Sequence, residues 1–502
     1  MPSRLLTKFT ARLLAFGVSI VVLLPLLASL TITHPQTAHA ATSPAYRYTK
    51  TFDTSAGSAN GNSVATDPQG NIYVTGQFQG TVVFDGPGGS DSQTSSNQSS
   101  FLTKYNADGT YAYTKTFDTS AGSAFGNGVA TDAQGNVYMT GGAVGTVVFD
   151  GPGGSDSQTM VNTDSFLTKY NANGSYAYTK TFDTSAGFAD GIGVATDPQG
   201  NVYTTGQFDG TVVFDGPGGS DSQTVAGSFA DTYLTKYNAN GTYAYTKTFD
   251  TSAGSAHARS QAVATDAQGN IYVAGEFQGT VIFDGPGGSD SQTSSNTNSY
   301  LTKYNANGTY AYTKTFDASA GSAHGYGVAT DSQGNVYVTG YFSGTVIFDG
   351  SGGSDSQTAG GGDNGFFLTS YSANGSYNYT RTFDTSTGGA YADGYGVATD
   401  GLDNVYVTGD FQETVVFDGT GGSDSRTSAN YNGFLTSFQA FTPSPPSPTP
   451  TPTPALVPGA PNTGFGVYMA NPLRTLLVYS LASVGLMGLA IACRKFTWRS
   501  AG

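Results

Sequence analysis

The feature that most constrains this chain is a repeat that returns six times between its two ends. The tripeptide Thr-Phe-Asp marks every copy, and one copy is about 66 residues long. A chain of 502 residues could hold two or three ordinary domains. Self-similarity on this scale favours one repetitive domain instead. The six markers begin at Thr51, Thr116, Thr181, Thr248, Thr315 and Thr382.

Each copy contains four segments of strand character, rich in aromatic and β-branched residues. In the second copy they are GVATD (128–132), NVYMTG (136–141), SFLTKYN (165–171) and YAYTKTF (111–117). Tight D-x-x-G-N and N-A-x-G turns join them in pairs. The segment GTVVFDG (145–151) predicts an extra short strand inside the longest connection. The 70 Gly, 32 Tyr and 31 Phe suit short aromatic strands joined by Gly-rich turns.

Four antiparallel strands repeated radially predict an all-β, six-bladed β-propeller. The two ends of the array support a closed ring. The array starts with a lone copy of the last strand, Tyr46 to Phe52, and ends after Phe434 to Phe441 with no such strand behind it. We therefore expect the N-terminal strand to complete the sixth blade, which removes an open sheet edge. An open β-solenoid is the alternative.

The repeats also resemble the SBBP β-propeller repeat family of exported bacterial proteins. The matching motifs are G-V-A-T-D, G-N-V-Y-V-T-G and F-L-T-K-Y-N-A-N-G, as at residues 327–340 and 367–376, the latter with Ser370 in place of Lys. The resemblance covers nearly all of 45–441. This chain departs by having Tyr, as at Tyr113, where the family tends to have Trp, and six copies where the family implies seven blades. The resemblance implies a fold and no particular activity.

Both ends of the chain read as address signals. Residues 1–40 combine Arg4, Lys8 and Arg12 with an apolar run and an Ala38-His39-Ala40 cleavage site, which predicts a secretory signal peptide. The expected ectodomain is therefore 41–441. A Pro-rich linker follows at 442–461, then an apolar run at 475–493, long enough for a transmembrane helix, and a basic cytoplasmic tail at 494–502.

The order of linker, P-N-T-G motif (460–464), apolar span and basic tail resembles the sorting signal of sortase-anchored wall proteins. The resemblance implies processing at Pro461, Thr463 and Gly464, with cleavage between the last two. Ala460 stands where the family usually has Leu. A plain membrane anchor without a sortase is the alternative. Either way we expect an exported protein at the cell surface, attached to the wall or the membrane.

The net charge of the chain limits which classes of partner it can bind. The net charge is −15, and leaving out three basic residues of the leader and four of the tail makes the part between them −22. This disfavours nucleic acid and anionic membrane surfaces as partners. The only cysteine, Cys493, lies in the apolar C-terminal run, so the chain has no intrachain disulfide.

Two sets of residues are candidate sites. The first is a column that follows each S-A-G-x-A segment, expected to ring the mouth of a central channel. It includes the two histidines left after signal removal, which adjacent blades could bring together for a metal or acid–base role. Two solvated loop histidines are the simpler alternative. The column consists of Asn60, Phe125, Asp190, His257, His324 and Tyr391.

The second set is the acid pair in each F-D-G-x-G-G-S-D-S segment. Paired carboxylates on a Gly-rich loop suit calcium, although no cofactor is required and Asp in such turns usually caps nearby backbone N–H groups. The calcium candidates are Asp85, Asp91, Asp150, Asp156, Asp215, Asp221, Asp284, Asp290, Asp349, Asp355, Asp418 and Asp424.

The sequence points to a surface-anchored binding, adhesion or scaffold module that presents repeated loops on one propeller face. Its expected partner is the cell envelope or an extracellular macromolecule such as a glycan. A structural spacer without a small ligand is the first alternative. An extracellular polysaccharide-active enzyme is the second, although the sequence contains no catalytic motif.

Overall fold

The computed structural model describes residues 50–439, apart from 226–229, 351, 360–363, 384, 386–389 and 419–421. The predicted signal peptide, Pro-rich linker, sorting motif, apolar span and basic tail all lie outside this range. Within the described residues, no helix is long and apolar enough to cross a membrane.

The described chain folds into six antiparallel sheets, one for each repeat, which we call blades 1 to 6 in chain order. Blade 1 contains β1 (Asp53–Thr66), β2 (Ile72–Val83), β3 (Ser92–Tyr105) and β4 (Tyr111–Thr116). Blade 2 contains β5 (Asp118–Thr131), β6 (Val137–Val148), β7 (Ser157–Tyr170) and β8 (Tyr176–Thr181). Blade 3 contains β9 (Asp183–Thr196), β10 (Val202–Val213), β11 (Ser222–Thr224), β12 (Asp231–Tyr237) and β13 (Tyr243–Thr248).

Blade 4 contains β14 (Asp250–Thr265), β15 (Ile271–Ile282), β16 (Ser291–Tyr304) and β17 (Tyr310–Thr315). Blade 5 contains β18 (Asp317–Thr330), β19 (Val336–Ile347), β20 (Ser356–Thr358), β21 (Gly365–Tyr371) and β22 (Tyr377–Thr382). Blade 6 contains β23 (Tyr391–Thr399), β24 (Val405–Val416) and β25 (Ser425–Phe438).

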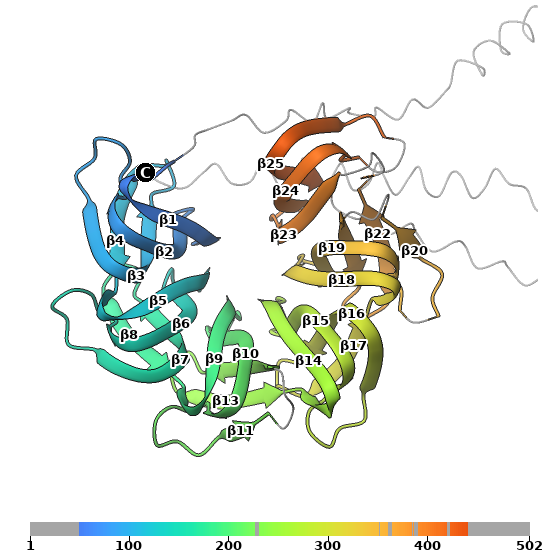
Figure 1. Cartoon of the computed structure of the whole chain (residues 1–502), viewed down its shortest axis with the longest axis horizontal. Helices are drawn as coiled ribbons and strands as arrows, with labels where there is room; N and C mark the ends of the chain where they lie inside the picture. The colour runs from blue at the N-terminus through green and yellow to red at the C-terminus, as the bar shows by residue number, and fades with distance from the viewer. Residues whose placement is uncertain are drawn as a thin grey trace, which may run out of the picture. The chain divides into compact units, whose positions relative to one another are not determined.

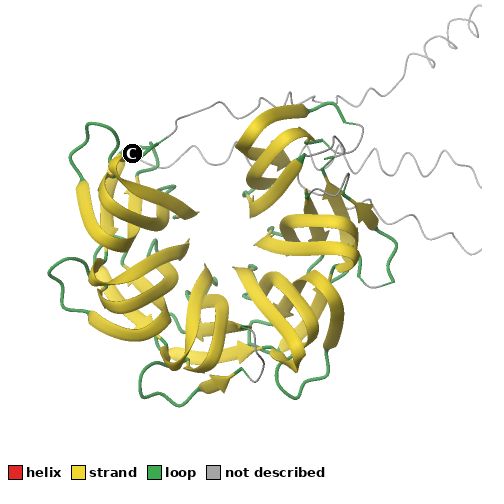
Figure 2. Ribbon diagram, in the orientation of Figure 1, coloured by secondary structure: helices red, strands yellow, loops and turns green. Residues whose placement is uncertain are grey.

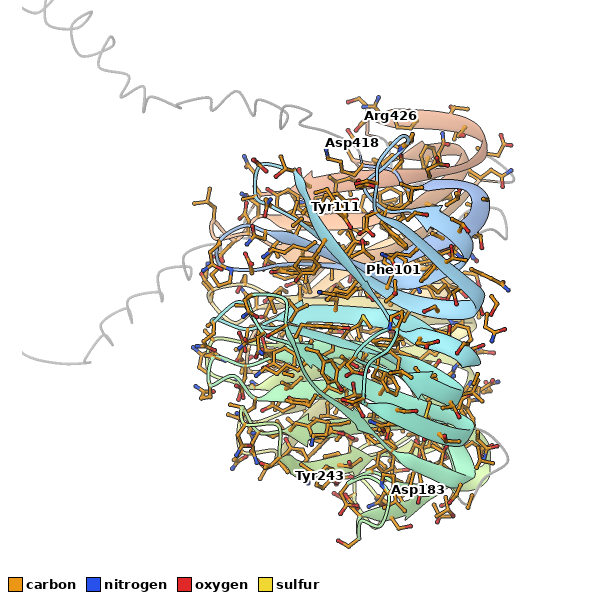
Figure 3. The ribbon with its side chains drawn as sticks, turned by 90° about the vertical axis from the view of Figure 1, so that its left-hand side faces the viewer. Phe101, Tyr111, Asp183, Tyr243, Asp418 and Arg426 are labelled. Atoms are coloured by element: carbon orange, nitrogen blue, oxygen red, sulfur yellow. The ribbon has the colours of Figure 1, made fainter. Side chains whose placement is uncertain are left out.

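The six blades stand radially around a common axis, with the first strand of each blade innermost (Figures 1 and 2). This arrangement is a six-bladed β-propeller, as the repeat predicts. A side view places Phe101 within blade 1 and Tyr111 on its outer strand (Figure 3).

The strands are longer than the sequence suggests, and two expectations about loops are wrong. The expected extra strand GTVVFDG is not separate, because its first four residues continue β6. The segment before GVATD is not a loop, because β5 pairs with β6 from Asp118↔Val148 to Thr131↔Val137. The segments 95–99 and 160–164, whose sequences differ between the repeats and which suggest variable loop tips, accordingly lie inside β3 and β7. The reversal between second and third strands is made by the F-D-G-x-G-G-S-D segment, which we call the rim turn.

Aromatic rings fill the interior of every blade. In blade 2, the ring centroid of Phe117 lies 4.9 Å from that of Phe149 and 5.3 Å from that of Phe166. All three rings are buried. Phe117 comes directly after the outer strand of blade 1, so each outer strand anchors the next blade's core.

Neighbouring blades are joined by a repeated set of contacts. Val129 of blade 2 packs in one buried cluster with Tyr73 and Leu102 of blade 1. The hydroxyl of Thr131 donates a hydrogen bond to the carbonyl of Thr66 at 2.7 Å. The same threonine bond recurs from blade 3 to 2, 4 to 3, 5 to 4 and 6 to 5, through Thr196, Thr265, Thr330 and Thr399.

The sides of blades 1 and 6 that would meet in a closed ring expose side chains that are buried at the other blade junctions. Val64 of β1 is 64% exposed, whereas its equivalent Val129 is 6% exposed. Leu435 of β25 is 70% exposed, whereas Leu102 is fully buried. These are the two halves of the contact that joins the other blades.

The predicted closing strand is described only from residue 50 onward. Phe52 packs on Phe84 at 4.9 Å and Phe101 at 5.3 Å between centroids, as Phe117 does in blade 2. This end of the strand therefore has the expected place against blade 1. Pairing of residues 46–49 with β25 lies outside the described residues and stays a prediction.

Candidate ligand site on the inner strands

The strand register defines the column more accurately than the sequence does. Each column residue lies six positions before the threonine that ends its inner strand, and it pairs across to the second strand of the blade. By this criterion the column is Asn60, Phe125, Asp190, Arg259, His324 and Asp393. The predicted members His257 and Tyr391 are therefore wrong by two residues.

The reason for this error is an insertion. In β14 the segment between the S-A-G motif and the final threonine is two residues longer, and the extra length is absorbed at register shifts between Ala253 and His257. The corresponding segment before Thr399 in blade 6 is also longer by two. Counting forward from the S-A-G position thus stops two residues short in these two blades, whereas hydrogen-bonded pairing fixes the position.

The partners across the register form a second variable set, which we call the slot. Each slot residue directly follows the dipeptide T-G, or A-G in blade 4. The residue after the slot residue is Phe in five of the six blades. They are Gln77, Gly142, Gln207, Glu276, Tyr341 and Asp410. Sequence reasoning missed them, although a single variable position inside the otherwise constant T-G-x-F motif was a usable signal.

Slot residues meet column residues of the next blade. Nε of Arg259 in blade 4 donates to Oε1 of Gln207 in blade 3 at 2.6 Å. Nδ1 of His324 in blade 5 contacts the Glu276 carboxylate in blade 4. Adjacent inner strands are thereby linked by side chains that differ from blade to blade.

The blade 4–5 junction combines charge with aromatic surface. Glu276 is 7% exposed and its contact with His324 accounts for one carboxylate oxygen. The His324 ring stacks on Tyr341 at 4.4 Å between centroids. Burial lowers the pKa of His257, although the charge of Glu276 opposes this shift. Both histidines therefore interact with the Glu276 carboxylate, although they do not occupy equivalent positions in their blades.

The pKa values of two column carboxyl groups are raised by their surroundings. Burial raises the pKa of Asp190 to about 6, against the opposing effects of the Arg259 charge and a hydrogen bond from Asn127. Burial also raises the pKa of Asp393 to about 6. Asp393 pairs in register with Asp410, and one oxygen of each is buried without a hydrogen-bond partner among the described residues.

A cavity of about 590 Å³ opens beside the column in blades 3 and 4. It is lined by Arg259, His257 and Glu276, by the amides of Gln207 and Gln278, and by Ser294 and Ser295. Concave sites with a few convergent polar groups are where small ligands bind. This cavity is specific to one part of the ring because its polar lining changes from blade to blade.

The rim-turn aspartates accept hydrogen bonds from within their own turns. In blade 2, Oδ1 of Asp150 accepts a hydrogen bond from Asp156 N at 2.9 Å and Oδ2 accepts one from Ser155 N at 2.8 Å. Asp156 in turn accepts the hydroxyl of Tyr176. Among the described residues, no group of three or more His, Cys, Asp or Glu could hold a metal ion. Calcium binding at the rim turns stays a prediction.

Comparison with known proteins finds a family model that matches parts of two repeats. The β-propeller repeat family SBBP matches residues 54–77 and 318–344. An uncharacterized WD repeat-containing protein of Acanthamoeba polyphaga mimivirus is 26% identical over 342 residues, which is 57% of this chain and 24% of the relative. The matched region thus spans about a quarter of that relative.

The chain is also similar to solved structures, at low sequence identity and with low TM-scores. A regucalcin from Agrobacterium tumefaciens is 10% identical, with a TM-score of 0.31, over 69% of this chain and 81% of the other. An ulvan lyase in complex with a saccharide is 12% identical, with a TM-score of 0.35, over 76% and 83%. The two matched segments lie in blades 1 and 5. Two of the six blades of this propeller therefore match the SBBP β-propeller repeat.

Proposed function

We propose that this propeller is an exported, surface-anchored binding module that recognises an extracellular saccharide through the inner strands of blades 3 to 5. The observation that carries the proposal is where the blades differ. Their cores and interfaces repeat, whereas the column and slot residues vary among the blades, and three of them, Gln207, Arg259 and Glu276, line the cavity. A repeated fold whose side chains vary around one cavity is typical of a rigid scaffold that carries one binding site.

The chemistry at that junction suits a sugar. Gln207, Gln278 and Glu276 offer amide and carboxylate groups for ring hydroxyls. The Tyr341 ring, stacked on His324, offers an apolar face with one polar edge. These groups also differ from the rim turns, whose carboxylates are engaged within their own turns. We therefore assign binding to the inner strands in preference to the repeated loops.

Two substitutions test this assignment on an immobilised glycan screen. Tyr341→Ala and Glu276→Gln are expected to weaken binding of the captured glycans about tenfold or more. Gln77→Ala alters the same slot in blade 1 and should bind like the wild type. Equal binding by all four proteins would exclude this junction as the site. A wild type that captures no glycan favours the spacer alternative.

The address signals need a separate experiment. Expression in a host with a sortase should yield a mature chain that begins at Ala41 and is released from the wall only by wall digestion. Thr463→Ala should leave it in the membrane fraction. If both proteins partition alike into the membrane fraction, the C-terminus acts as a plain anchor.

An enzyme is the second candidate, and one observation favours it. Glu276 and Arg259 line one cavity, and His324 contacts Glu276, which is a combination that can move a proton and hold an anionic group. Incubating bound glycan with the protein and measuring new reducing ends or unsaturated products decides the question. Unchanged glycan after long incubation excludes hydrolysis and elimination of that glycan.

A further inference from the structure

One permanent positive charge stands on the inner strands. The lysines of the described blades occupy two repeated positions, where they lie over tyrosine rings, as Lys169 does 5.2 Å from the Tyr138 centroid. Arg381 takes one of those positions, and Arg426 lies in blade 6 beside Asp424. Arg259 is thus the one basic residue at a column or slot position apart from His324.

The guanidinium of Arg259 keeps one edge available. Its Nε donates to Gln207, and the side chain is exposed at the cavity. Among the described residues it makes no ion pair within 4 Å. The nearest acids have other contacts, since Glu276 meets His324, and Asp190 accepts a 3.2 Å hydrogen bond from Asn127. The two Nη groups can therefore reach a ligand.

Apart from the Glu276 carboxylate, which contacts His324, the other groups that line the cavity are donors and acceptors without a fixed charge. Gln278, Ser294 and Ser295 line the wall beyond the arginine. His257 is held toward its neutral form because burial lowers its pKa. A single fixed cation among amides and hydroxyls matches a ligand with one anionic group and several hydroxyls.

We propose that the cavity binds a uronic acid residue of a saccharide, with Arg259 pairing to its carboxylate. This inference rests on the proposed function and names its ligand class. A planar guanidinium pairs with a carboxylate through two parallel N–H···O bonds, which gives both orientation and affinity. The Gln and Ser side chains then hold the ring hydroxyls.

The acidic character of the chain does not oppose contact pairing. The rim-turn and D-x-x-G-N carboxylates lie at the ends of the strands, away from the column. The two carboxylates near Arg259 already have partners, since Glu276 contacts His324 and Asp190 accepts a hydrogen bond from Asn127. At an ionic strength of about 0.15 M the screening length is about 8 Å, so distant charges act weakly on a bound sugar. The contact with Arg259 operates inside that length.

The test uses oligomers of galacturonate and of mannuronate, each with its carboxyl groups free or methyl-esterified. Calorimetry on the full chain at about 0.15 M salt compares wild type with Arg259→Gln, Arg259→Lys and Arg426→Gln. We expect a free-acid oligomer to bind at least tenfold more tightly than its ester. Arg259→Gln should remove that preference, Arg259→Lys should keep only part of it, and Arg426→Gln should keep it fully.

The outcomes separate this inference from the proposed function. Equal affinity for acid and ester, or an Arg259→Gln protein that keeps the preference, overturns the uronate assignment. If Tyr341→Ala still abolishes binding in that case, saccharide recognition at the junction stands. If no oligomer and no glycan on the screen binds wild type, both fail. Melting temperatures of the variants exclude unfolding as the cause.

Discussion

At the scale of single residues, the aspartate of each D-x-x-G-N turn organises more structure than any other side chain. Asp132, 4% exposed, accepts from Gln134 N at 3.0 Å, from Asn136 N at 2.9 Å and Nδ2 at 2.8 Å, and from the Tyr138 hydroxyl at 3.0 Å. The same four bonds recur in blades 1, 3, 4 and 5. The turn and the buried tyrosine beyond it are therefore held by one carboxylate.

Replacing that carboxylate should be costly. Asp132→Ala leaves the Tyr138 hydroxyl buried without an acceptor and frees three turn donors, so we expect a loss of about 2–4 kcal/mol in unfolding free energy. Chemical denaturation measures it. Asp118→Ala, which removes one exposed bond to Ser120 N, is the control and should change stability by about 0.5 kcal/mol or less. Similar losses in both variants would contradict this account.

A buried carboxyl in blade 2 should make stability depend on pH. Burial, and then the Asp183 charge, raises the pKa of Asp164 to about 7. The folded chain thus keeps this proton more tightly than the unfolded chain, so stability is full at low pH and falls as the pH rises from about 4 through 7. Asn298 occupies the same position in blade 4 and accepts a hydrogen bond from Ala318 N at 3.0 Å.

Asp164→Asn should therefore stabilise the protein at pH 8, by about 1–2 kcal/mol after allowance for solvent screening, and give little gain at pH 4. Asn298→Asp is the reciprocal variant and should destabilise at pH 8. Thermal melts at the two pH values measure both effects. A lower melting temperature for Asp164→Asn at pH 8 would show that the carboxylate form is the favoured one.

At the scale of elements, the glycine before each slot residue permits the hairpin of the two inner strands. A Cβ built on Gly141 would lie 1.7 Å from the carbonyl oxygen of Phe125, which no rotamer can relieve. The two strands approach this closely at the register shift between Gly126 and Gly128. The column residue and the glycine before the slot therefore lie at a close approach of the two inner strands.

Gly141→Ala should therefore lower unfolding free energy by more than about 2 kcal/mol, because the clash is with backbone. Gly401→Ala, at a position with no atom within 4 Å, is the matched control and should melt like the wild type. Equal melting of both proteins would mean that the strand pair can open at this point without cost.

The elements also show how far sequence reasoning reaches. Four strands, their order and six blades follow from aromatic periodicity and turn motifs. The long first halves of the inner strands do not, because S-A-G-S-A has little β-propensity and is held as strand by pairing with its neighbour. Asp190 and His324 are found in their places, whereas Arg259 and Glu276 require the register, since pairing across strands is not local in sequence.

At the scale of the whole molecule, the repeated pairing predicts how the ring closes. In blade 1, Thr103 faces Thr114 with their hydroxyls 2.9 Å apart. The same register applied to the last blade sets Thr436 opposite Thr49. Closure would also bring the slot residue Asp410, with its unpartnered buried oxygen, to the amide of Asn60.

A disulfide tests this closure. In a chain with Cys493→Ser, Thr49→Cys and Thr436→Cys should oxidise to one intramolecular bond and raise the melting temperature. If the ring closes in this way, the closing strand buries Tyr46, Tyr48 and the Leu435 face, each such side chain contributing about 1.5–3 kcal/mol. Deleting residues 46–51 should then lower the melting temperature strongly. Moving the strand behind Phe441 should restore it. A deletion without effect would favour an open array.

The threonine bonds between inner strands have an evolutionary consequence. Each joins a hydroxyl to a carbonyl of the preceding copy, and the valine, tyrosine and leucine around it are the same at each described junction. These packing contacts encode no position in the series, whereas the column and slot contacts do. Duplication or loss of one whole repeat by unequal recombination would therefore keep the packing of every junction and change only which column and slot side chains face each other.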